Sequence, residues 1–202
     1  MKPSTCRVLS CFLFLLVLAT SSARAEQVAG FKNEYLDDFA VTSRQVVQLA
    51  EAMPAEKYAW RPGEGVRSAS EVYVHIAAGN FLLLALAGVK PPDEYFPREL
   101  ASGKDSVQAI IEHNTKLEKS ITEKDKVGRM LKASLDAVRE QFSKLTPADL
   151  DKPADFFGDK TTVRRVYLRI LAHVNEHMGQ SIAYARVNGV VPPWSRAQSG
   201  AD

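Results

Sequence analysis

Two histidines, His173 and His177, stand four residues apart in a segment whose apolar periodicity predicts a helix. Four residues make about one helical turn, so both imidazoles project from the same face of that helix. This spacing suits the chelation of a transition metal. A third histidine, His75, lies far upstream in another apolar helical segment. Three neutral imidazoles can bind a divalent metal and leave one coordination position open for water or substrate.

The histidine pair belongs to a stripe of residues that is expected to face the core. Two histidines, a glutamine and a tyrosine take positions in it that Leu or Val usually occupies. Burying such groups without partners costs about 1–3 kcal/mol each, and a metal removes that cost for imidazoles. His75 lies on the inward stripe of its own helix as well. The predicted stripe consists of Val163, Val166, Ile170, His173, His177, Gln180, Tyr184 and Val187.

Three side chains near the pair are candidates for supporting roles. Glu176 lies just off the stripe, and either a solvated position or a contact to a metal ligand would explain it. Gln180 and Tyr184 follow His177 by one and two turns and could orient a ligand or a bound water. Core packing explains Tyr184 equally well. No further catalytic residue can be identified from the pattern.

Two other interpretations of the histidines are weaker. The order His173-x-x-Glu176-His177 matches the inverted zinc-protease motif, which needs a third, carboxylate ligand well downstream. Asp202 is the only acid downstream, so a protease is disfavoured. His113 lies between two polar residues of a polar helix and is predicted to be solvated.

Residues 1–25 have the layout of a secretory signal peptide. Lys2 and Arg7 give a basic start, residues 11–19 are apolar, and Ala23-Arg24-Ala25 is a small-x-small cleavage site. The apolar run is too short to span a bilayer, which takes roughly 20 residues. We therefore expect cleavage after Ala25, a periplasmic or secreted protein, and no stable membrane insertion of the mature chain.

The mature chain of residues 26–202 would be nearly neutral. The leader holds three of the 26 basic residues and none of the 24 acidic ones, which leaves 23 bases and 24 acids. This balance gives no reason to expect a nucleic-acid partner. Both cysteines, Cys6 and Cys11, lie in the leader, so the mature protein has neither thiol nor disulfide. Its stability must come from packing, to which a bound metal could add.

The apolar pattern predicts an all-α domain over residues 26–195, followed by a disordered tail over 196–202. Four main amphipathic helices, with a long connection between the second and third, favour an up-down four-helix bundle. The pattern leaves open whether 106–145 is one bent helix or two, and it shows no strand-like alternation. The helices are expected over about 31–53, 68–87, 106–120, 122–145 and 162–188.

Local signals place the ends of these helices. Ser68-x-x-Glu71 predicts a capping box for the second helix, and Thr122-x-x-Asp125 predicts another for the helix that ends near residue 145. Thr161 or Thr162 is expected to cap the last helix, and Gly189 is expected to end it.

These residues together resemble the DinB/YfiT-like superfamily of metalloenzymes, over nearly all of residues 31–195. The pattern as a whole is specific, whereas the histidine pair alone would not be. The resemblance rests on Trp60-Arg61-Pro62, on His75 within Ser70-Glu71-Val72-Tyr73-Val74-His75-Ile76, on His173-Val174-Asn175-Glu176-His177-Met178-Gly179-Gln180, and on Tyr184-x-Arg186-x-Asn188-Gly189-x-x-Pro192-Pro193.

The resemblance implies an up-down four-helix bundle, often a homodimer, with a divalent metal, commonly zinc or nickel, on three histidines. By the matching motifs these are His75, His173 and His177. Characterised relatives include thiol-dependent transferases and isomerases, and most members have no known substrate. Two features depart from the family: Met178 stands where many relatives have arginine, and the chain has an export signal although low-molecular-weight thiols are mainly cytosolic.

The sequence therefore predicts an exported metal-dependent hydrolase or transferase acting on an unknown small molecule. Two alternatives remain open at this stage. One is a non-enzymatic metal-binding or structural bundle, and the other is a bundle without metal in which the histidines bond to one another. An open pocket beside the histidines, with polar groups directed into it, would favour the enzyme.

Overall fold

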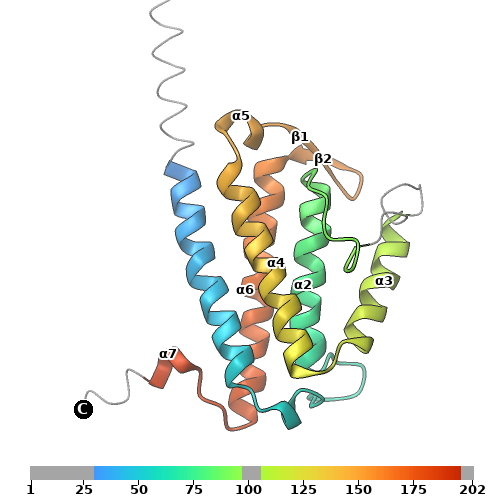
Figure 1. Ribbon diagram of the computed structural model, residues 1–202, viewed down its shortest axis with the longest axis vertical. Helices are drawn as coiled ribbons and strands as arrows, with labels where there is room; N and C mark the ends of the chain where they lie inside the picture. Colours follow the sequence, from blue (N-terminus) through green and yellow to red (C-terminus); the bar gives the residue numbers. More distant parts are fainter. Residues whose placement is uncertain (1–29, 97–105, 197–202) are drawn as a thin grey trace, which may run out of the picture.

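The computed structural model describes residues 30–96 and 106–196. Most of these residues are helical, and the long helices run side by side (Figure 1). The predicted signal peptide and the tail beyond residue 196 lie outside the described residues and stay predictions. The long helices are the N-terminal helix (residues 30–52), α2 (Ala69–Leu86), α4 (Lys124–Lys144) and α6 (Val163–Val187).

Helix α3 (Ser106–Ser120) lies beside α2 (Figure 1). It packs there through a small apolar cluster of Leu82, Phe96 and Ile110. The segment 106–145 is thus two helices, because residues 121–123 are not helical. The predicted capping box at Thr122 is wrong: α4 begins one residue later than that box requires, its N-cap is Glu123, and the Glu123 side chain makes no capping bond.

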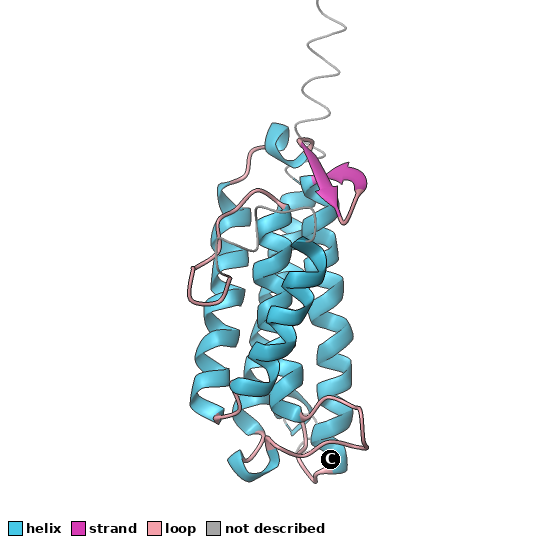
Figure 2. Cartoon of the chain, turned by 90° about the vertical axis from the view of Figure 1, so that its right-hand side faces the viewer, coloured by secondary structure: helices cyan, strands magenta, loops and turns pink. Residues whose placement is uncertain are grey.

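Short elements occupy the ends of the bundle. They include a hairpin that the sequence pattern did not predict, in which Pro153 pairs with Thr162 and Phe156 with Asp159 (Figure 2). Its strands have four residues each, too few for alternation to be recognised in the sequence. These elements are η1 (Ala55–Lys57), α5 (Pro147–Leu150), β1 (Pro153–Phe156), β2 (Asp159–Thr162) and α7 (Pro193–Arg196).

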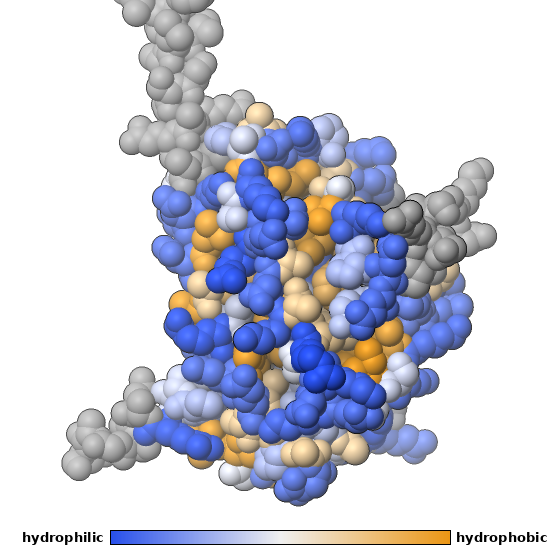
Figure 3. Space-filling model, in the orientation of Figure 1, coloured by the Kyte–Doolittle hydropathy of each residue, from blue (hydrophilic) through white to orange (hydrophobic). Residues whose placement is uncertain are grey.

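Helix α2 is the central helix of the core. Ser68 and Glu71 form the predicted capping box at its start, and its side chains are buried nearly all round because α3, α4 and α6 pack against it. It is long and apolar enough to cross a membrane, but 78% of it is buried inside the protein, as expected for a core helix. In the view of Figure 3 hydrophilic side chains cover most of the surface, with apolar ones visible between them.

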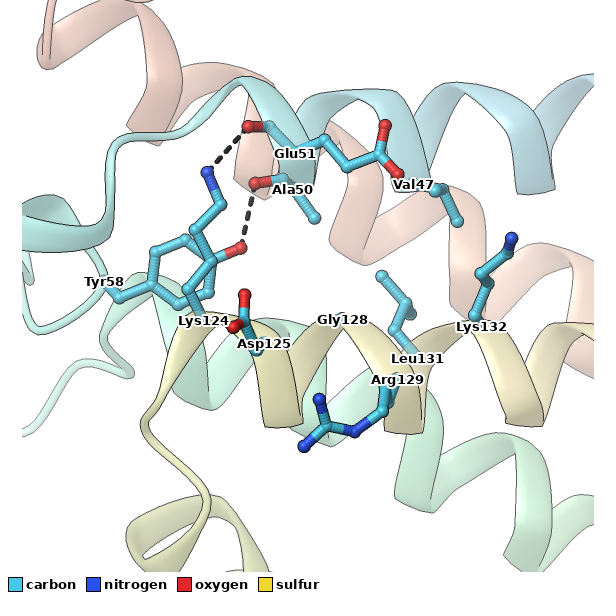
Figure 4. A pocket seen from close by; sticks show the side chains of 10 residues that line it. All are labelled: Val47, Ala50, Glu51, Tyr58, Lys124, Asp125, Gly128, Arg129, Leu131 and Lys132. Atoms are coloured by element: carbon cyan, nitrogen blue, oxygen red, sulfur yellow. Dashed lines mark hydrogen bonds between the residues drawn. The ribbon is translucent and has the colours of Figure 1, made fainter.

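A lysine fixes the C-terminal end of the N-terminal helix. Lys124, the first residue of α4, donates from Nζ to the carbonyl oxygens of Glu51 and Met53, each at 2.8 Å. The Tyr58 hydroxyl donates to the Ala50 carbonyl at 2.8 Å (Figure 4). Carbonyls at a helix C-terminus lack partners within the helix, and a cation there is favourable. These bonds fix the start of the loop that leads to α2.

Helix α6 follows the prediction except at its last turns. Thr162 is the N-cap, its Oγ1 accepting from the Arg165 amide, and Gly189 has the left-handed φ of 76° that ends the helix. Val187, predicted to face inward, is 73% exposed. The predicted stripe repeats every 3.5 residues, and a straight helix with 3.6 residues per turn drifts away from such a repeat by about 20° per heptad.

Candidate metal centre

Two helices bring the three predicted histidines together. His75 lies in α2, two turns after the Ser68 cap, and His173 and His177 lie in α6, which packs against α2. One ring nitrogen from each lies within 4.8 Å of those of the other two. The Nε2 atoms of His75 and His173 are 3.2 Å apart. Side chains far apart in sequence thus converge on one point, as the spacing predicted.

A glycine makes room for this cluster. Gly79 lies one turn beyond His75 on α2, directly against the imidazole of His173. A Cβ placed there would overlap Cε1 of His173 and come within 3.0 Å and 3.1 Å of its two ring nitrogens. Any side chain larger than hydrogen would therefore displace His173 or separate the two helices.

A buried carboxylate holds His75. The Nδ1–H of His75 donates to Glu118 Oε1 at 2.7 Å, and Arg67 donates to both oxygens of Glu118, at 2.7 Å and 3.3 Å. The side chain of Glu118 is only 8% exposed, although it comes from the otherwise polar helix α3. An imidazole that donates to a carboxylate in this way presents its Nε2 lone pair in a fixed direction, as metal-ligating histidines commonly do.

His177 has an acceptor of its own. Its Nδ1–H donates to Gln180 Oε1 at 3.0 Å, Gln180 Nε2 donates to the Tyr184 hydroxyl at 2.8 Å, and that hydroxyl donates to the carbonyl of Arg67 at 3.2 Å. The Arg67 side chain in turn binds Glu118. One continuous chain of hydrogen bonds therefore links the outer nitrogens of His75 and His177 through Arg67.

Electrostatics keep the cluster ready for a cation. Burial, and then the neighbouring imidazoles, lower the pKa of His173 to about 3, and burial also lowers the pKa of His177. Burial by itself would raise the pKa of Glu118, but hydrogen bonds from His75 and Arg67 lower it below its usual value. At neutral pH the site thus combines the neutral imidazoles of His173 and His177 with the ionised carboxylate of Glu118.

The donor set fits a divalent transition metal. Two nitrogens bound tetrahedrally to zinc at about 2.0–2.1 Å lie about 3.3–3.4 Å apart, close to the 3.2 Å between His75 and His173. The Nδ1 atom of His173, the ring nitrogen on the other side from His75, is buried and has no hydrogen-bond partner among the described residues. An imidazole cluster with this shape could hold a metal ion.

The remaining candidates lie in different places. Gln180 and Tyr184 belong to the hydrogen-bond chain behind His177, and their role toward a ligand or a bound water stays a prediction. Glu176 faces away and forms a two-pronged ion pair with Arg169, at 2.6 Å and 2.9 Å. His113 lies apart from the cluster, and its expected solvation is incomplete because it is half-buried and donates to the Tyr95 carbonyl at 3.2 Å.

Sequence reasoning missed Glu118 and Arg67. A signal for the glutamate was present, because Asn114 and Glu118 continue the inward face of α3 at four-residue spacing from Ile110, and both are buried. Buried charges are rare without a partner, so an acid on an inward face predicts one. Arg67 stands in the loop before the Ser68 cap, where no periodicity could reveal its contact.

Beside the histidines lies a cavity of about 600 Å³. Its walls include Glu118 and Gln180, which are the partners of His75 and His177. Arg61, Arg67 and Lys119 also line it, so three cationic side chains border the space next to the candidate metal centre. Trp60 packs edge-on against Tyr184, with ring centroids 5.3 Å apart, and joins the Trp60-Arg61-Pro62 motif to this region.

Comparison with known proteins identifies the same family that the motifs indicated. The chain resembles a DinB-like protein of Bacillus subtilis with a TM-score of 0.55 and 21% identity over 77% of this chain and 92% of the other. It resembles a DinB-like protein of Bacillus cereus with a TM-score of 0.53 and 19% identity over 79% and 93%. No curated protein matches. The DinB superfamily pattern matches residues 38–181, well over half of the chain, and the protein therefore belongs to the DinB superfamily.

Proposed function

We propose that this protein is a metal-dependent hydrolase or transferase with a divalent ion bound by His75, His173 and His177. The observation that carries the proposal is the direction of the imidazoles. His75 and His177 each donate Nδ1–H to a dedicated acceptor, which leaves their Nε2 lone pairs available in one small volume. A divalent ion held there would supply Lewis acidity, lowering the pKa of a water or polarising a substrate oxygen or sulfur.

Exposure of the site favours an enzyme over a purely structural metal. The side chain of His75 is 23% exposed and His177 is half-buried, whereas structural metal sites are normally closed. The neighbouring cavity is lined by charged and amide side chains rather than by apolar ones alone. Zinc or nickel is our first expectation for the metal, because imidazole suits both and availability often decides.

The metal-free alternative also has an observation in its favour. The 3.2 Å between His75 Nε2 and His173 Nε2 is a hydrogen-bond distance if one of the two nitrogens carries a proton. The two alternatives differ in what a chelator does: it would lower the melting temperature of a metal protein and leave a metal-free bundle unchanged.

Elemental analysis of residues 26–202 tests the proposal directly. We expect about one metal per chain, with loss of the metal in a His173→Ala/His177→Ala double variant. His113→Ala is the matched control, because it removes a histidine outside the cluster and should keep the metal. Absence of metal from the unaltered protein, even after incubation with zinc and nickel, would leave the metal-free bundle.

We also propose that the four long helices alternate in direction as an up-down bundle, and that the chain is exported through residues 1–25. The basic start, the short apolar run and the small-x-small site support export. Expression of the full chain in a bacterium with a periplasm, followed by mass measurement, should give a protein that begins at Glu26. Retention of the complete leader in the cytosol would contradict this part of the proposal.

A further inference from the structure

The cavity beside the histidines has an uneven balance of hydrogen-bonding groups. Its two carboxylates are already engaged: Glu71 accepts from Arg61 and from the Ser68 amide, and Glu118 accepts from His75 and Arg67. The carbonyl oxygen of Gln180 accepts from His177. The carboxylate and amide side chains of the cavity wall therefore already accept hydrogen bonds from groups of the protein itself.

The donors are not used up in the same way. Lys119 is exposed at the cavity and its ammonium has no partner among the described residues. Arg67 uses Nε and Nη2 on Glu118, and no residue of the described chain accepts from its Nη1. A guanidinium carries five N–H donors and an ammonium three. The cavity thus presents free N–H donors on Lys119 and Arg67, whereas the carboxylate of Glu118 is already bound by His75 and Arg67.

In the cavity of Figure 4 the lysine side chain is engaged instead. There Lys124 also lies at a cavity wall, but two carbonyl oxygens take its ammonium and join two helices. No equivalent contact holds Lys119 within the residues described. The ammonium of Lys119 therefore remains available to bind a ligand.

We propose that this cavity binds the acidic group of a small molecule, a carboxylate or a phosphate, through Lys119 and Arg67. Such groups form charge-assisted hydrogen bonds with both side chains, and the arginine fork suits either shape. Glu118 and Gln180 separate the cavity from the histidines by a single side chain, so the rest of the bound molecule lies beside the candidate metal centre. The inference rests on the proposed function in one respect, that the acidic molecule is the substrate.

Calorimetric titration of the metal-loaded protein with inorganic phosphate, and separately with succinate, tests this inference. Lys119→Ala should weaken the preferred anion about fivefold or more, the loss expected for one charge-assisted hydrogen bond. Lys116→Ala is the matched control: it removes the same charge from an exposed position of α3, one turn earlier and outside the cavity wall, and should change binding less than twofold. Tighter phosphate identifies a phosphoester-type ligand, and tighter succinate identifies a carboxylate.

Backbone amide shifts locate the bound anion. Perturbations confined to residues 61–67 and 115–119, and kept after metal removal, support the cavity. Equal losses in the two lysine variants, or no binding of either anion, overturn the proposal. Binding that disappears with the metal and ignores Lys119→Ala places the anion on the metal and also overturns it.

The metal content of the same samples separates this inference from the proposed function. The Lys119 side chain forms no hydrogen bond or ion pair with the histidines or with Glu118 and Gln180 among the described residues, so its alanine variant should retain the metal. Anion binding in a protein that takes up no metal would retain the cavity and refute the metalloenzyme. Metal uptake without anion binding would retain the proposed metalloenzyme and refute the anion-binding cavity.

Discussion

The first turns of α6 and the turns that follow contribute to the same core in different ways. Near the start of α6, Tyr167 packs into an aromatic layer with Tyr35 and Phe142, where ring centroids lie 4.0–6.0 Å apart. Farther along α6, His173 and His177 face His75. The aromatic layer leaves the hydroxyls of Tyr35 and Tyr167 buried without partners among the described residues, whereas a chain of donors and acceptors serves His75 and His177.

The core thus contains two kinds of buried polar group: hydroxyls that have no hydrogen-bond partner and imidazoles whose orientation is fixed by hydrogen bonds. An isolated buried hydroxyl costs free energy and orders nothing. A chain of bonds that runs from His75 to His177 through Arg67 fixes the directions of two imidazoles. Substitutions in the two layers should therefore have opposite outcomes.

The largest effect is expected from Gly79→Ala. The added methyl would overlap the His173 ring, and overpacking of this kind costs about 1–3 kcal/mol of stability. Metal binding should be lost together with stability. Chemical denaturation and elemental analysis measure both. Gly128→Ala is the control in α4, where a Cβ meets nothing within 4 Å, and it should stabilise the protein by up to about 1 kcal/mol. Equal behaviour of the two variants would contradict the close approach of α2 to His173.

Glu118→Ala should weaken metal binding about ten- to a hundredfold, because loss of an acceptor behind a metal-bound histidine has effects of this size. Glu118→Gln keeps an acceptor for His75 and should recover part of the loss. Competition with a chromophoric chelator measures the affinity. Glu112→Gln, an exposed change on the same helix, serves as the control. Unchanged affinity in Glu118→Ala would mean that His75 needs no partner from α3.

The stability of the chelator-treated protein should fall as pH decreases below about 6.5. The folded state keeps His173 neutral down to about pH 3, whereas the unfolded chain takes up a proton near the ordinary value of 6.5. The unfolded state then binds one proton more than the folded state, so the free energy of unfolding falls by about 1.4 kcal/mol per pH unit. Denaturation at pH 7, 6 and 5 measures the slope. His173→Gln should flatten it, and an equal slope in that variant would assign the effect to other groups.

The smallest effect is expected in the aromatic layer. Tyr35→Phe and Tyr167→Phe remove unpartnered buried hydroxyls, so stability should stay within about 1 kcal/mol of the unaltered protein or rise. Metal content should not change. Loss of metal in a Tyr→Phe variant would show that metal binding depends on the aromatic layer and would contradict the comparison.

The site histidines were predictable because their spacing is local. His173 and His177 share a helix face by sequence distance alone, and His75 falls on the inward stripe of a helix that Ser68 marks. Glu118 and Arg67 were not found in this way, because their contacts cross from α3 and a loop to α2. The hairpin was missed because its strands are short. Val187 was wrongly placed in the core because the 3.5-residue repeat was extended to the end of a helix that has 3.6 residues per turn.

Helix α3 makes the site separable from the fold. It touches the bundle mainly through α2, and the long helices pack with one another without it. Yet it supplies the acid behind His75 and one wall of the cavity. A deletion that removes α3 from the connection between α2 and α4 should therefore leave a folded bundle that keeps the three histidines but lacks the acceptor for His75 and one wall of the cavity. Diversification of the substrate in this scaffold would begin with that connection and leave the core intact.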